Sequence, residues 1–393
     1  MQLFALLAVA ASQRPALTSL PPQIQSIRAD LGLSLAAISL LTAIPLLCFG
    51  AAAPIGISPA ARSRSPEVVI FFFLVLLTFA SGVRVLSGWP LLYFGTAMTG
   101  IAIAALNVVV PVLIKRDFPT KITTIMPIYT SVLAISATIS AALSVPISNM
   151  TTHNWRAGIG FFALPGILAL ALWAPLVYHR RHDVVPKFSG HAHISRSLRR
   201  DPIAWAVTIF FGIQSATFYS TVAWLPKTFI DAGYSPAGAG GMLAFCTAIS
   251  IPSSLLLPLL LGRGIDQRRM VVATTASSLI GYSGLSLAPT AAPLFWVLLL
   301  GVGQASFPAA LVMMTLRARS IEETGPLSSM TQGVGYLIAA VGPIVIGLAN
   351  QHSGSWKLPY ALLSVAVMVQ LLFGLIAGKP RIDEIDHREK SNV

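Results

Sequence analysis

The sequence predicts an all-α, polytopic membrane protein with twelve transmembrane helices arranged as two parallel repeats of six. Three observations lead to this prediction. Of the 393 residues, 55% are hydrophobic and only 10% are charged, whereas soluble domains carry about 25% charged residues. The apolar residues gather in runs of about 20 or more, the length at which a helix crosses a bilayer. The two halves of the chain also match each other at one constant offset.

The apolar runs predict helices at 2–27, 36–57, 67–87, 91–114, 122–148, 156–178, 203–230, 238–261, 269–288, 292–316, 326–350 and 357–378. The links between these runs are short, except for the basic and polar stretch 179–201. We therefore expect a first six-helix half at 1–178, a linker at 179–201, a second half at 202–378 and a polar tail at 379–393.

The charges are distributed unevenly over the two sides of the predicted bundle. The net charge of +13 suggests nucleic-acid binding at first, but basic and aromatic residues do not interleave in any soluble patch. Of the 26 Lys and Arg residues, twenty fall on the side of the termini, four on the opposite side and two within helices. The positive-inside rule then places both termini in the cytoplasm. We expect the chain to lie in the cytoplasmic (inner) membrane.

The two halves match without gaps at an offset of 201 residues. Gln13 corresponds to Gln214, and Trp155 corresponds to Trp356. The motif Asp-x-Gly-x-Ser occurs at 30–34 and again at 231–235. A repeat of six helices has an even topology, so the copies are parallel and related by an axis along the membrane normal.

Arg14 lies near the middle of the first apolar run. A central arginine costs about 2.5–3.5 kcal/mol on insertion scales, and neither membrane interface is close enough for its side chain to snorkel. We therefore expect Arg14 to face a polar interior and to anchor a substrate site; the alternative is a structural cation capped by helix carbonyls. Arg84, about one turn from the end of its helix, is expected to snorkel outward.

Several segments resemble one branch of the major facilitator superfamily, the cyanate permease and 2-nitroimidazole transporter group. The resemblance covers nearly the whole chain and rests on residues 14–18, 27–34, 40–45, 107–119, 214–215, 218–219, 224–226, 303–304, 330–336 and 342–343. It implies the major facilitator fold, in which the first, fourth, seventh and tenth helices line a central cavity.

The resemblance therefore implies that polar residues at mid-membrane depth form the substrate site. They are Arg14, Gln13, Asn107, Gln214, Tyr219 and Gln304, with Gln332 and Tyr336 from the eleventh helix and Tyr129 from the fifth. The planar fork of an arginine suits a carboxylate, a nitro group or another small planar anion. The alternatives are structural roles, in which the amides hydrogen-bond one helix to another and the tyrosines contribute only to packing.

A cytoplasmic gate is a further expectation, formed by Lys115, Arg116, Asp117 and Asp266. The superfamily's loop between the second and third helices usually carries an acid, but residues 58–64 contain none, while the second copy keeps Asp266. The gate is therefore expected to differ between the two halves. The positive-inside rule alone accounts equally well for the basic residues Lys115 and Arg116. The glycine-rich pattern of drug–proton antiporters is absent from residues 131–146.

All 13 acids and seven histidines fall outside the predicted helix centres. A deep cation with no deep anion favours an anionic solute over an organic cation. We expect a secondary active or facilitative transporter of a small anionic or nitro/cyanate-like solute; the alternative is an exporter of amphipathic drug-like compounds. An enzyme would need a nucleophile with a base, or clustered metal ligands, and Cys48 and Cys246 have no such spacing.

The expected partners are therefore a small-molecule substrate and membrane lipid. No cofactor, metal or nucleic acid is expected. By analogy with other transporters of this architecture, one chain is expected to work as a monomer.

Overall fold

The computed structural model describes residues 2–52, 65–118, 122–152, 155–180, 198–262, 267–318 and 321–378, and in these residues it contains helices and no strand. Each of the twelve predicted runs corresponds to a helix or to a helix in pieces. In the first half the elements are α1 (Gln2–Gln13), α2 (Pro15–Thr18), η1 (Pro21–Gln23), α3 (Ile24–Leu31), α4 (Leu35–Ala52), α6 (Pro66–Val83), α7 (Trp89–Asp117), α8 (Ile122–Asn149), α9 (Trp155–Gly160), η3 (Phe161–Ala163) and α10 (Leu164–Arg180).

The second half continues in the same way. Its elements are η4 (Leu198–Arg200), α11 (Pro202–Asp231), α12 (Pro236–Gly262), α13 (Gln267–Leu287), α14 (Pro293–Gly303), α15 (Ser306–Leu316), α16 (Ile321–Ser353) and α17 (Lys357–Ala377). Within the described ranges, ten helical stretches are long and apolar enough to cross a membrane, and Leu35–Ala51 is a shorter apolar one. The fold class predicted from the sequence is confirmed.

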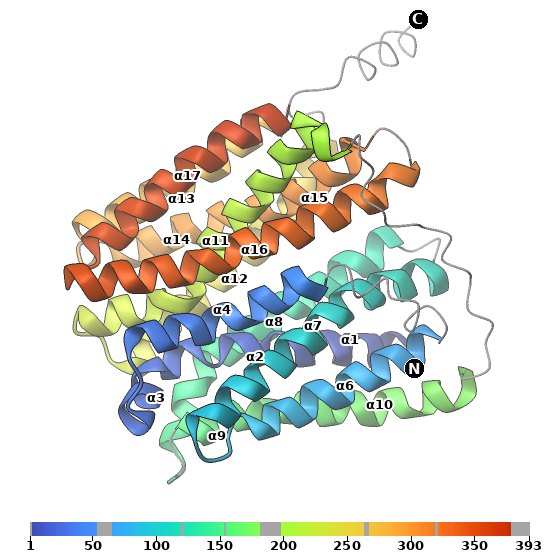
Figure 1. The fold of residues 1–393 in the computed structure, drawn as a ribbon, viewed down its shortest axis with the longest axis horizontal. Coiled ribbons are helices and arrows are strands. Elements are labelled where there is room, and N and C mark those ends of the chain that lie inside the picture. The colour runs from blue at the N-terminus through green and yellow to red at the C-terminus, as the bar shows by residue number, and fades with distance from the viewer. Residues whose placement is uncertain are drawn as a thin grey trace, which may run out of the picture.

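The helices form two groups that lie side by side. Figure 1 shows α1 to α10, in blue to green, below α11 to α17, in yellow-green to red. The start of α1 and the end of α17 lie at the same end of the bundle, as an even number of crossings requires. The domain boundaries at 178 and 202 stay predictions, because most of the linker lies outside the described residues.

The turn after the first crossing of each half is built in the same way. Gly32 has φ +64° and Gly233 has φ +94°, a conformation that glycine adopts at little steric cost. Ser34 and Ser235 each accept a hydrogen bond, at 3.1 Å, from the backbone N–H three residues later. These caps begin α4 and α12. The repeated motif is therefore a turn that ends one helix and starts the next.

The repeated Asp and Trp residues also meet in space. Trp155 donates from Nε1 to Asp30 Oδ2 at 3.1 Å, and Trp356 donates to Asp231 Oδ2 at 3.0 Å. In each half this bond ties the end of the first crossing to the start of the sixth. Residues matched by the offset of 201 thus occupy equivalent positions in the two halves.

The two groups of helices pack against each other through a few elements. α4 packs along α16, α8 packs along α12, and η1 packs against α11 and α12. Gly347 on α16 permits a close approach to α4, because an added Cβ would lie 2.0 Å from Ser39 Oγ. Thr138 on α8 lies 3.0 Å from Thr247 on α12, hydroxyl to hydroxyl. These contacts position the site described next.

The first crossing is not the single helix that we expected over 2–27. α1 ends at Gln13, Arg14 adopts a turn, and α2 begins at Pro15. Proline has no N–H and cannot complete the helical hydrogen bond. Pro21 and Pro22 repeat this effect, and there the chain adopts the tighter 3₁₀ geometry of η1.

The tenth crossing, expected as one helix over 292–316, is also divided. α14 ends at Gly303, residues 304–305 form a turn, and α15 begins at Ser306. Pro308 cannot donate to the carbonyl of Gln304, which instead accepts from Phe307 N at 3.0 Å. Arg14 and Gln304, both predicted site residues, therefore lie at breaks in their helices.

Candidate functional site

Arg14 joins the two halves of the molecule. It lies at the break between α1 and α2 and is partly exposed. Its Nη1 donates to the hydroxyl of Tyr219 on α11 at 3.4 Å, which is long for a hydrogen bond and correspondingly weak. Among the described residues, the ionisable groups that interact with Arg14 are the phenols of Tyr219, Tyr336 and Tyr129, with no carboxylate among them.

Gln13 is fully buried and turns toward the first half. Its Nε2 donates to Tyr129 Oη at 2.9 Å and to Val9 O at 3.2 Å. Its Oε1 has no hydrogen-bond partner within the described part of the chain. Gln13 and Tyr129 therefore form one unit, which packs α1 against α8 directly beside Arg14.

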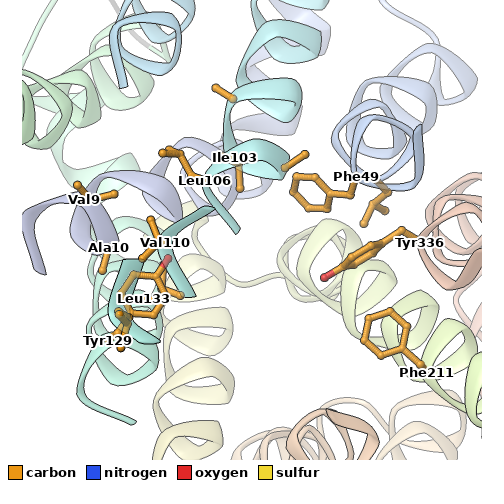
Figure 2. Close-up of a cluster of buried hydrophobic side chains, with 14 of the residues drawn as sticks. Val9, Ala10, Phe49, Ile103, Leu106, Val110, Tyr129, Leu133, Phe211 and Tyr336 are labelled. Atoms are coloured by element: carbon orange, nitrogen blue, oxygen red, sulfur yellow. The ribbon is translucent and has the colours of Figure 1, made fainter. Parts of the chain in front are cut away.

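A chain of aromatic rings extends from Tyr219 across the boundary between the halves. Phe49 on α4 lies 5.3 Å from Tyr336 on α16 and 6.4 Å from Tyr219, measured between ring centroids. Phe211 lies 5.2 Å from Tyr336, again between ring centroids. Figure 2 shows the hydroxyl of Tyr336 pointing toward the elements of the first half. Phe49 was not predicted, because hydropathy does not separate a site-lining phenylalanine from one that faces lipid.

The remaining predicted amides occupy separate positions. Asn107 is partly exposed in the middle of α7, and Gln214 is buried, accepting from Ser215 Oγ at 3.3 Å. Gln304 donates to Cys246 Sγ at 3.1 Å, and Gln332 donates to Ser328 Oγ at 2.9 Å. The structure thus brings together Arg14, Tyr219, Tyr336 and Tyr129, whereas Gln214, Gln304 and Gln332 bond to other neighbours.

Two of the predicted gate residues take part in an ion cluster inside the first half. Arg116 pairs with Glu67 and, at 2.6 Å, with Asp117, which also accepts from Gln2. These bonds raise the pKa of the Arg116 guanidinium, and the hydrogen bond to Asp117 is the largest cause. The cluster joins α1, α6 and α7. The side chain of Lys115 and all of Asp266 lie outside the described residues, so the gate stays a prediction.

The expectation that Arg84 snorkels outward is wrong. Its side chain is only 1% exposed, and its Nη1 donates to the carbonyl of Ala16 at 2.5 Å. The expectation rested on the position of Arg84 about one turn from the end of its helix, from which the side chain could reach the membrane surface. The break in the neighbouring crossing instead offers a buried carbonyl, which stabilises the guanidinium in the interior.

The fold and the comparison with known families agree. The family model described as Major Facilitator Superfamily matches residues 3–343. The chain belongs to the Major Facilitator Superfamily. It is a multi-pass membrane transporter of a small solute and not an enzyme.

Three curated relatives match almost end to end. An uncharacterised transporter of Bacillus subtilis is 36% identical, over 95% of this chain and 92% of its own length. The 2-nitroimidazole transporter of Escherichia coli is 33% identical, over 96% of this chain and 95% of its own. The cyanate transport protein of the same organism is 26% identical, over 98% of both chains. These names support the resemblance found in the sequence.

Solved structures of the superfamily share the fold at low identity. A bacterial homologue of the lysosomal transporter Spinster, in an inward-facing and unoccupied conformation, aligns with a TM-score of 0.74 at 15% identity, over 96% of each chain. A D-xylose–proton symporter aligns with a TM-score of 0.72 at 13% identity, over 96% of this chain and 99% of its own.

Proposed function

We propose that this transporter carries a small planar solute bearing a negative or strongly polarised group, of the carboxylate, nitro or cyanate kind, and that Arg14 binds that group. The observation that carries the proposal is the environment of Arg14. In the described part of the chain this deep guanidinium has a phenol as its hydrogen-bond acceptor, at 3.4 Å, and no carboxylate. A charge at this depth is stabilised only by a partner or by water.

The aromatic rings narrow the class of solute further. Phe49, Tyr219 and Tyr336 lie around the boundary that Arg14 bridges. Aromatic faces and edges favour flat, conjugated partners, while the arginine fork favours two coplanar oxygens. A flat anion or nitro compound satisfies both groups at once. The name of the 2-nitroimidazole relative agrees with this class, and the name of the cyanate relative agrees with a small anion.

Transport follows the alternating-access scheme, in which the two halves rock around a site near the bilayer midplane. Arg14 and Phe49 come from the first half, and Tyr219 and Tyr336 come from the second. A solute held between them contacts both halves. In this proposal both termini lie in the cytoplasm, because twenty of the 26 Lys and Arg residues fall on their side.

Uptake into proteoliposomes tests this function. The panel contains cyanate, nitrate, benzoate, 2-nitroimidazole and, for the amphipathic-drug alternative, ethidium. At least one flat anion or nitro compound should be taken up, and Arg14→Gln should weaken its uptake by about ten- to a hundredfold, the equivalent of one charged hydrogen bond. Arg199→Gln, which removes an exposed arginine, serves as the matched control.

Two outcomes would contradict the proposal. One is uptake of ethidium without uptake of any flat anion or nitro compound. The other is uptake of benzoate or 2-nitroimidazole that Arg14→Gln leaves unchanged.

A further inference from the structure

Arg84, like Arg14, lies among the helices of the first half. It caps α6 and is 1% exposed. Its Nη1 donates to Ala16 O at 2.5 Å, while its Nε has no hydrogen-bond partner in the described part of the chain. Gly95 on α7 makes room for it, since an added Cβ would lie 2.6 Å from Arg84 Cγ. A cation so deeply buried persists only where other groups stabilise it.

The carbonyl that Arg84 binds belongs to the broken part of the first crossing. α2 contains only four residues, Pro15 to Thr18. The last carbonyls of a helix have no intrahelical partner and need another donor. Ala16 is two residues beyond Arg14, so a bond to its carbonyl fixes the short segment that carries the substrate-binding guanidinium.

In the second half the corresponding carbonyl also accepts from a side chain, but a neutral one. The position that corresponds to Ala16 is Thr217, and its carbonyl accepts from Tyr282 Oη at 3.2 Å. Tyr282 lies on α13, the counterpart of α6, and α11 is unbroken there. A neutral hydroxyl thus serves as the donor in one half, whereas the half with the broken helix and Arg14 uses a buried cation.

We infer that Arg84 is a positioning residue for solute binding: by holding the Ala16 carbonyl it fixes α2 so that Arg14 faces α11. This inference rests on the proposed role of Arg14. Arg84 also adds a second positive charge to this part of the first half, which favours an anion there because the described residues show no carboxylate beside it.

The test compares Arg84→Gln and Arg84→Lys with Tyr282→Phe, the matched change in the other half. The first measurement is benzoate uptake into proteoliposomes. Arg84→Gln should raise KM about tenfold and leave the maximal rate within about twofold, since it weakens binding and not the rocking step. Arg84→Lys, which keeps a charged donor, should recover most of the affinity, and Tyr282→Phe should leave KM unchanged.

The second measurement needs no solute. Hydrogen exchange of amides 16–20 should become about tenfold faster in Arg84→Gln, while amides 217–221 in Tyr282→Phe should change little because α11 is continuous. If wild-type protein takes up neither benzoate nor any other flat anion or nitro compound of the panel, the proposed solute class fails and the exchange measurement alone decides the role of Arg84.

Two results would overturn the inference. One is unchanged exchange at amides 16–20 in Arg84→Gln. The other is a loss of thermal stability and maximal rate with KM unchanged, which indicates a purely structural residue.

Discussion

Three arginines in the first half occupy different environments, and the environment decides what each can do. Arg116 binds two carboxylates, Arg84 binds a backbone carbonyl, and Arg14 has only a distant phenol among the described groups. Arg116 is satisfied by its carboxylates, and Arg84 is held by a carbonyl although its Nε has no partner among the described residues. Arg14 keeps most of its donors for another partner, as expected of a residue that binds a solute.

The carboxylate of Glu67 provides a prediction at this scale. Glu67 is 1% exposed and its partner Arg116 is 22% exposed. Glu67→Gln keeps the shape but removes the charge, so it should destabilise the protein by about 1–2 kcal/mol, less than a fully buried pair because Arg116 retains Asp117 and some water. The thermal midpoint should fall by a few degrees, whereas Arg199→Gln should leave it unchanged. An unaltered midpoint in Glu67→Gln would show that the cluster is not stabilising.

At the scale of single helices, the sequence predicted where the crossings lie but not where they break. Hydropathy detects apolar length, and α1 to α3 read as one run because Pro15, Pro21 and Pro22 are themselves apolar. Those prolines nevertheless indicate possible breaks, because a proline lacks the backbone N–H that a helix needs. For the same reason Arg84 was misassigned, because its partner is a carbonyl freed by a break in another helix.

Pro15→Ala tests the importance of the break. Alanine restores the N–H that the carbonyl of Ala11 lacks, so α1 and α2 should join and Arg14 should turn with them. Solute KM should rise about tenfold while the protein stays as stable or becomes more so, because proline inside a helix costs about 3 kcal/mol. Pro226→Ala, within the continuous α11, is the control. Unchanged KM, together with slower amide exchange around residue 15, would contradict this role of the break.

At the scale of the whole molecule, the two halves were visible in the sequence because residues that build turns recur. The positive-φ glycines and the Asp–Trp bonds occupy matched positions. The boundary between the halves was less predictable. Polar residues at depth identified Arg14, Tyr129 and Tyr219, but the apolar Phe49 carries no such signal, and the partners of Gln304 and Gln332 depend on side-chain packing.

Cross-linking tests whether the halves move relative to each other. In a variant with both native cysteines replaced, Thr138→Cys with Thr247→Cys should form a disulfide between α8 and α12, since the hydroxyls lie 3.0 Å apart. Oxidation should then abolish uptake, and reduction should restore it. Thr208→Cys with Thr331→Cys joins α11 to α16 inside one half, across 3.3 Å, and should leave uptake intact. Equal inhibition by both pairs would argue against rocking of the halves.

The most direct test of the central claim is a thermal-shift titration of purified wild-type protein, Arg14→Lys and Arg14→Gln with the flat anion or nitro compound that is best transported. A ligand that binds only the folded state raises its apparent stability, and at a given concentration the rise is larger when the ligand binds more tightly. The account predicts a clear rise for wild type, a smaller rise for Arg14→Lys, which keeps the charge but loses the planar fork, and the smallest rise for Arg14→Gln. An equal rise in all three proteins would contradict it.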